Sequence, residues 1–151
     1  MSEPHAAVHP IVLDSSVLVA YERMKSPGSA AMHETQAWIG GWLLRGTQLL
    51  IPAVSLAVAS VECEGRVPEL DYLLRGDPDL VTVVPLISSS AVDVGAAVAA
   101  SGGKELLDLE IAQVVWCAIG HAAEEDPAER WPVATYWPDW YAEKAVPIIA
   151  L

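Results

Sequence analysis

Three residues with oxygen-bearing side chains, Asp14, Ser15 and Ser16, directly follow the short apolar run of residues 11–13. That run has the length and composition of a buried strand, and residues 17–23 after it read as a helix. Ligands of open α/β sheets bind at the carboxyl ends of the strands, so its position makes Asp14 a candidate site residue. Asp and Ser also cap helices well, and a purely structural cap is the alternative.

A second acid, Asp108, lies in the first turn of the strongest predicted helix, residues 104–121, whose apolar positions follow the 3.6-residue period. An acid there is favoured by the helix N-terminus, which again gives a structural alternative. Glu110 is two positions further on and is expected to point away from Asp108. From the start of its helix, Asp108 could reach the strand end that carries Asp14.

The elements that would position these acids alternate along the chain. Strands are predicted at 11–13, 48–51, 80–86, 131–135 and 146–150, and helices at 17–23, 30–45, 54–64, 68–75, 88–100 and 104–121. This alternation predicts an α/β fold with a central parallel sheet of about five strands and helices on both faces. The carboxyl edge of that sheet would gather Asp14, Ser15, Ser16, Ser55 and residues 135–139.

Length and composition indicate a single domain over residues 1–151, with residues 1–9 as a flexible N-terminal arm whose His5 and His9 are solvated. The formal charge of -12, from 20 acids and 8 bases, disfavours loose binding of nucleic acid. Cys63 and Cys117 are isolated, so neither a zinc site nor a disulfide framework is indicated. Without a secretory signal or an apolar stretch of ~20 residues, we expect a cytoplasmic protein and no membrane segment.

Four blocks of the sequence resemble a known family. Residues 11–21, 50–65, 106–120 and 133–141, followed by a terminal apolar strand, are similar in order and separation to the blocks of PIN domains. The resemblance covers nearly the whole chain and is closest to the small, single-domain toxins of the VapC type. It implies a three-layer α/β/α fold.

The resemblance also implies a ribonuclease with four acids around one or two Mg²⁺ or Mn²⁺ ions. Hard cations prefer oxygen ligands, and a bound ion can activate water and neutralise the phosphate being cleaved. Asp14 matches the first acid of the family and Asp108 the third, as catalytic residues and metal ligands. Ser15, Ser16 and Thr135 would orient ligands or phosphate. The implied partners are RNA, an antitoxin protein and a second copy in a homodimer.

Two positions depart from the family pattern. Val58 stands where the family has Glu, and Trp137 replaces the acid of the Thr-x-Asp block that begins at Thr135. Glu62, one turn after Val58, and Asp139 are the acids that could compensate. We therefore expect low or absent nuclease activity. The alternative is an inactive PIN-fold module that binds a protein or RNA partner, with Trp137 filling the place of the missing acid.

Overall fold

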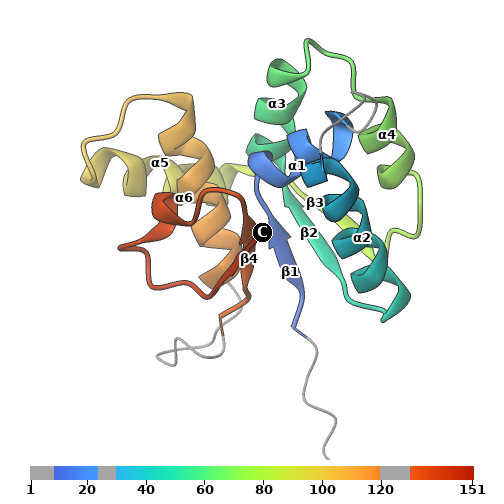
Figure 1. Cartoon of the computed structure of the whole chain (residues 1–151). Helices are drawn as coiled ribbons and strands as arrows, with labels where there is room; N and C mark the ends of the chain where they lie inside the picture. The colour runs from blue at the N-terminus through green and yellow to red at the C-terminus, as the bar shows by residue number, and fades with distance from the viewer. Residues whose placement is uncertain (1–8, 24–29, 120–129) are drawn as a thin grey trace, which may run out of the picture.

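The structure, a computed structural model, describes residues 9–23, 30–119 and 130–151 (Figure 1). Most of the expected N-terminal arm and the predicted loop at 124–127 lie outside the described residues. The elements in chain order are β1 (Ile11–Leu13), α1 (Ser15–Glu22), α2 (Ala30–Leu44), β2 (Leu49–Pro52), α3 (Ala53–Glu62), α4 (Pro68–Leu74), β3 (Val81–Val84), α5 (Ser88–Ala100), α6 (Leu106–Ile119), β4 (Val133–Thr135), the 3₁₀ helix η3 (Pro138–Tyr141) and β5 (Ile148–Ala150).

The five strands form one sheet in the order β3-β2-β1-β4-β5, and every neighbouring pair is parallel. The predicted α/β class and the parallel sheet of about five strands are thereby confirmed. Strand β1 is central, with Val12 opposite Leu50 on one side and opposite Val133 on the other. The chain leaves β1 toward β2 on one side and reaches β4 on the other, so the strand order reverses at β1. Such switch points are where open α/β sheets form crevices for ligands.

Because successive side chains of each strand point to opposite faces of the sheet, the strands contribute to two apolar cores, one on each face. Ile11 and Leu13 of β1 pack into the larger cluster, with residues of α1, α2 and α4, whereas Val12 packs into a second cluster with Val114 and Val133. Successive strand side chains point to opposite faces, which explains why an uninterrupted apolar run forms a strand covered on both sides.

The helices divide between the two faces. Figure 1 shows α1, α2 and α4 on one side of the sheet and α5 and α6 on the other, which gives the three-layer α/β/α arrangement. Helix α6 packs against β1 and β2, whereas α5 packs on α6. Within residues 9–23, 30–119 and 130–151, none of the helices is both long and apolar enough to cross a membrane.

Candidate functional site

Asp14 follows β1 immediately and is fully buried. Its Oδ1 accepts hydrogen bonds from the Ser16 amide at 3.0 Å and the Ser16 hydroxyl at 2.5 Å, and more weakly from the Val17 amide at 3.4 Å. Its Oδ2 accepts a hydrogen bond from the Tyr141 hydroxyl at 2.9 Å. Asp14 therefore caps helix α1, and both of its carboxylate oxygens have protein donors.

Glu110 of α6 is the acid that meets this strand end. It is fully buried, its Oε1 accepts a hydrogen bond from the Ser15 amide at 2.7 Å, and its Oε2 accepts one from the Ser15 hydroxyl at 2.8 Å. The sequence reasoning did not propose Glu110 as a site residue. The signal was present, because residue 110 lies three positions after Leu107 and four before Val114, on the apolar stripe of the helix.

Burial dominates the electrostatics of these two acids. It raises the pKa of Asp14, although hydrogen bonds from Ser16, Thr135 and Tyr141 work in the opposite direction. Burial likewise raises the pKa of Glu110, against the hydrogen bonds from Ser15, and the nearby Asp14 charge raises it further. Burial and the Asp14 charge also raise the pKa of Tyr141, so its phenol remains a hydrogen-bond donor. The pair therefore favours taking up a proton over carrying two negative charges.

Asp108 has a different position and role. Its Oδ2 accepts hydrogen bonds from the amides of Lys104 at 3.0 Å and Glu105 at 2.9 Å, which caps the start of α6. Gly103 packs so closely on this carboxylate that an added Cβ would lie 2.8 Å from Asp108 Cβ. Asp108 and Lys144 line one hollow, whereas Ser15 and Glu110 line a different one. The structure thus brings Glu110, and not Asp108, to the Asp14 stretch.

A hollow of about 520 Å³ opens at the carboxyl edge of the sheet, and we refer to it as the edge hollow. Its polar lining comes from Ser15, Ser16, Arg23, Glu62 and Glu110, and its other lining residues are Val19, Val58, Leu106, Leu107, Trp137 and Trp140. The two positions at which this chain lacks an acid of the PIN pattern, Val58 and Trp137, are therefore in its wall. The sequence analysis predicted the candidate site at this carboxyl edge of the sheet. Glu62, one of the two possible compensating acids, also lines the edge hollow.

The aromatic side of the edge hollow is partly open to solvent. The Trp137 side chain is 57% exposed and stacks on Trp140 with a ring separation of 6.1 Å and an angle of 21°. Asp139, the other acid considered as a replacement, is exposed on η3 and does not line the hollow. Of the two compensating acids, only Glu62 is placed beside the candidate site.

The candidate substrate-binding hydroxyls are engaged with the protein itself. Ser16 Oγ accepts a hydrogen bond from the Tyr136 amide at 3.0 Å and lies 3.4 Å from Thr135 Oγ1. Thr135 Oγ1 in turn accepts a hydrogen bond from the Trp137 amide at 2.9 Å. These bonds fix the end of β4 against the start of α1. The buried Ser55 hydroxyl makes no hydrogen bond of good geometry within the described part of the chain, yet it lies close enough to Glu110 to lower the pKa of that carboxyl.

The residues present do not fit the divalent cation that the resemblance implies. Mg²⁺ requires a near-octahedral set of oxygen ligands, usually with one or two carboxylates facing water or substrate. Here all four carboxylate oxygens of Asp14 and Glu110 accept hydrogen bonds from the protein, and both side chains are sealed from solvent. Nor do the described residues contain a group of three or more His, Cys, Asp or Glu side chains arranged to hold a metal ion.

Comparison with known proteins adds no relative to this picture. The chain matches no family model, and no curated protein is significantly similar to it. A functional interpretation therefore depends on the fold, the sequence blocks and the geometry of the edge hollow.

Proposed function

We propose that this protein is a PIN-type domain related to the VapC-type ribonucleases, with low or absent nuclease activity. The observation that carries the proposal is the sealed carboxylate pair: Asp14 and Glu110 are used to join α1, α6 and η3 by hydrogen bonds. Cleavage assisted by Mg²⁺ or Mn²⁺ needs carboxylates that can approach a cation beside the phosphate. An ion that reaches the edge hollow would be held weakly.

The other walls of the edge hollow support the same proposal. Val58 and Trp137 occupy the positions of the two remaining family acids, and neither side chain can ligate a hard cation. The lining contains the single cation Arg23 beside the acid Glu62, in a chain of formal charge -12, whereas Glu110 is sealed from solvent. Phosphates of RNA would therefore find little positive charge here.

The second candidate function is an inactive PIN-fold module that binds a partner at the edge hollow. The observation that favours it is the stacked pair of Trp137 and Trp140, because exposed aromatic side chains are enriched at protein interfaces. A protein partner, such as the antitoxin that accompanies VapC-type toxins, is the form of this candidate that a hollow with so little positive charge supports. We also propose that the protein forms a homodimer and is located in the cytoplasm, whichever of the two candidate functions applies.

Metal binding and RNA cleavage test the first candidate. We expect no heat of binding at millimolar Mn²⁺ and no cleavage of a mixed-sequence RNA by the wild-type protein. Val58→Glu combined with Trp137→Asp places acids in the walls of the edge hollow and should raise Mn²⁺ affinity. Asp93→Asn, at an exposed acid of α5, is the control for nonspecific charge effects.

Cleavage by the wild type that disappears in Asp14→Asn and persists in Asp93→Asn would overturn the proposal of low activity. Cleavage that is equal in all three proteins indicates a contaminating nuclease. For the second candidate, we expect co-purification with the product of an adjacent small gene, lost in Trp137→Ala. Trp38→Ala, at another exposed indole, should retain the partner.

A further inference from the structure

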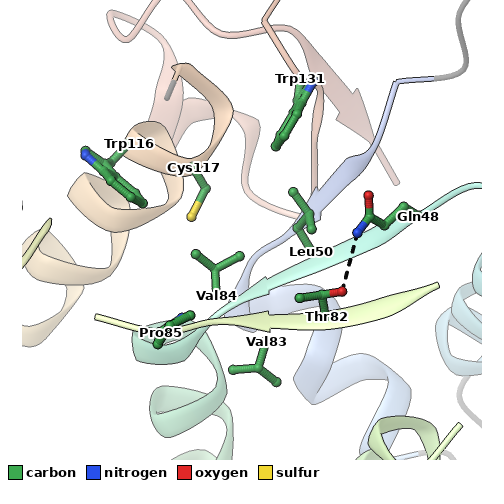
Figure 2. Close-up of a pocket in the computed structure, with 9 residues that line it drawn as sticks. All are labelled: Gln48, Leu50, Thr82, Val83, Val84, Pro85, Trp116, Cys117 and Trp131. Atoms are coloured by element: carbon green, nitrogen blue, oxygen red, sulfur yellow. Dashed lines mark hydrogen bonds between the residues drawn. The ribbon is translucent and has the colours of Figure 1, made fainter. Parts of the chain in front are cut away.

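A second hollow, of about 360 Å³, lies between α6, the edge strand β3 and its neighbour β2. Figure 2 shows Trp116 and Trp131 on two sides of it, with Leu50 and Val84 of the sheet nearby and with Gln48 and Thr82 at one end. We call it the sheet-margin hollow. It continues the second apolar cluster, to which Leu50 and Cys117 belong, out to the edge of the sheet.

The packing of this face explains why the sheet-margin hollow exists. A helix with its side chains is about 10–12 Å across, whereas five strands spaced ~4.8 Å apart span about 19 Å. Helix α6 covers β1 and β2, α5 packs on α6, and η3 covers β5. Beside α6, the elements of residues 9–23, 30–119 and 130–151 leave part of the apolar surface of β3 and of the adjoining side of β2 open. The hollow is thus a consequence of covering one face of the sheet mainly with a single helix.

Among the residues that the structure describes, those that line the sheet-margin hollow carry no charge. None of its nine lining residues is acidic or basic, and burial raises the pKa of the Cys117 thiol to about 12, so that the thiol is neutral. The edge hollow, by contrast, contains Arg23, Glu62 and Glu110. A charged ligand would lose its hydration in the sheet-margin hollow without gaining an ionic partner. This lining therefore selects a neutral ligand.

One end of the sheet-margin hollow offers a hydrogen-bond acceptor. Gln48 Nε2 donates to Thr82 Oγ1 over a long 3.4 Å, and Thr82 Oγ1 donates to the Pro78 carbonyl at 2.9 Å. In the described part of the chain, the side-chain oxygen of Gln48 accepts no hydrogen bond. That oxygen lies on the side of the amide away from Thr82 in Figure 2. It can accept a hydrogen bond from a ligand hydroxyl or N–H group.

We propose that the sheet-margin hollow binds a neutral, flat, mostly apolar small molecule that carries one hydrogen-bond donor. Its volume lies at the lower end of the ~300–1,000 Å³ typical of small-molecule sites, and the combination of apolar walls with few polar groups is also typical. The indoles of Trp116 in α6 and of Trp131, two residues before β4, provide aromatic surface for a planar ring. The ligand's donor pairs with Gln48 at the polar end. This site is independent of the edge hollow and of the function proposed for it.

The probe for the test is 2-naphthol, a neutral planar ring system with one hydroxyl group. In a titration followed by two-dimensional NMR, we expect the indole N–H signals of Trp116 and Trp131 to shift, with a dissociation constant on the order of 1 mM or tighter. Trp116→Phe and Trp131→Phe assign the two signals. Naphthalene-2-sulfonate, which has the same rings and a negative charge, should bind at least about tenfold more weakly.

Two variants examine the walls and the polar end separately. Val84→Phe fills the sheet-margin hollow and should weaken 2-naphthol binding about tenfold or more, whereas Val92→Phe, at an exposed position of α5, should leave it unchanged. Gln48→Leu removes the acceptor and should weaken binding by about threefold to tenfold. Circular dichroism verifies the fold of each variant, and Gln48→Leu decides the question if Val84→Phe does not fold.

Absence of shifts at the two indoles with millimolar 2-naphthol would overturn the proposal. Equal affinity for naphthalene-2-sulfonate would refute the selection of a neutral ligand. Shifts that spread over all six tryptophans and persist in both variants would indicate nonspecific adsorption, which also contradicts the proposal.

Discussion

Replacing the buried acid of α6 by its amide, Glu110→Gln, is expected to stabilise the protein at neutral and alkaline pH. The amide can keep both contacts, since its oxygen accepts from the Ser15 amide and its NH₂ group donates to the Ser15 hydroxyl. What the substitution removes is a carboxylate that is sealed from water and faces the charge of Asp14. The fold is kept while the unfavourable ionisation disappears.

The pH dependence gives the size of the effect. The raised pKa values mean that the folded wild type binds more protons than the unfolded chain, so its unfolding free energy falls as pH rises. The slope reaches about 1.4 kcal/mol per pH unit for each of the two groups. The raised pKa of Glu110 contributes to the unfolding free energy in full below the ordinary glutamate pKa of 4.5. This contribution is lost as pH rises through the pKa of Glu110 in the folded state. Glu110→Gln should flatten this curve and exceed the wild type in stability at pH ~8.

Urea unfolding between pH ~4.5 and ~8, followed by circular dichroism, measures these curves. Glu143→Gln, at an exposed acid, should have the same pH dependence as the wild type. Glu110→Ala leaves the buried Ser15 amide without its acceptor and should cost about 1–3 kcal/mol at pH ~4.5, with a smaller cost at pH ~8, where the wild type has lost the favourable contribution of Glu110. Parallel curves for the wild type and Glu110→Gln, or a variant less stable than the wild type at pH ~8, would refute the reasoning.

Three further substitutions separate the roles of the surrounding groups in the same urea assay. Tyr141→Phe removes the donor to Asp14 Oδ2 and should lower the unfolding free energy by about 1 kcal/mol; an unchanged midpoint would contradict this role. Asp108→Ala removes the cap on the Lys104 and Glu105 amides and should cost about 1 kcal/mol, without shifting the Ser15 amide resonance that reports on Glu110. Ser55→Ala removes a buried hydroxyl beside Glu110 that lowers the pKa of that carboxyl, so the variant should lose more stability than the wild type as pH rises; parallel curves would contradict this contact.

The course of the backbone could be predicted largely from the sequence. Short apolar runs alternating with amphipathic stretches were sufficient for the strands and helices, and for the parallel sheet that follows from their alternation. The differences lie at element ends. Helix α1 begins at Ser15, two residues before the predicted start, because Asp14 accepts the first amides. Strand β3 ends at Val84, two residues before its predicted end, and Pro85 follows it.

The candidate site could be predicted only in part. The position of Asp14 after β1 and the presence of residues 58 and 137 in one hollow agree with the expected carboxyl edge. The position of Glu110 at the Asp14 stretch could not be predicted from the family pattern, because that pattern places its acid at Asp108, whereas Glu110 lies on the apolar stripe of the helix. The structural role of Asp108 at the start of α6 was one of the two alternatives that its position in the sequence allowed, and its hydrogen bonds with the Lys104 and Glu105 amides agree with it.

The central place of β1 also has a consequence for the order in which the chain folds during synthesis. Strand β1 emerges first and finds β2 soon afterwards, but its other side pairs with β4, and Tyr141 lies 127 residues after Asp14. Contacts between such distant segments form slowly, and an unpaired strand is prone to associate with other chains. Until the C-terminal strands emerge from the ribosome, Asp14 is a hydrated, charged group at an open strand end. In the folded protein, burial disfavours the negative charge of Asp14. Before β4 has paired with β1, the same charge acts against pairing of the open strand with another chain.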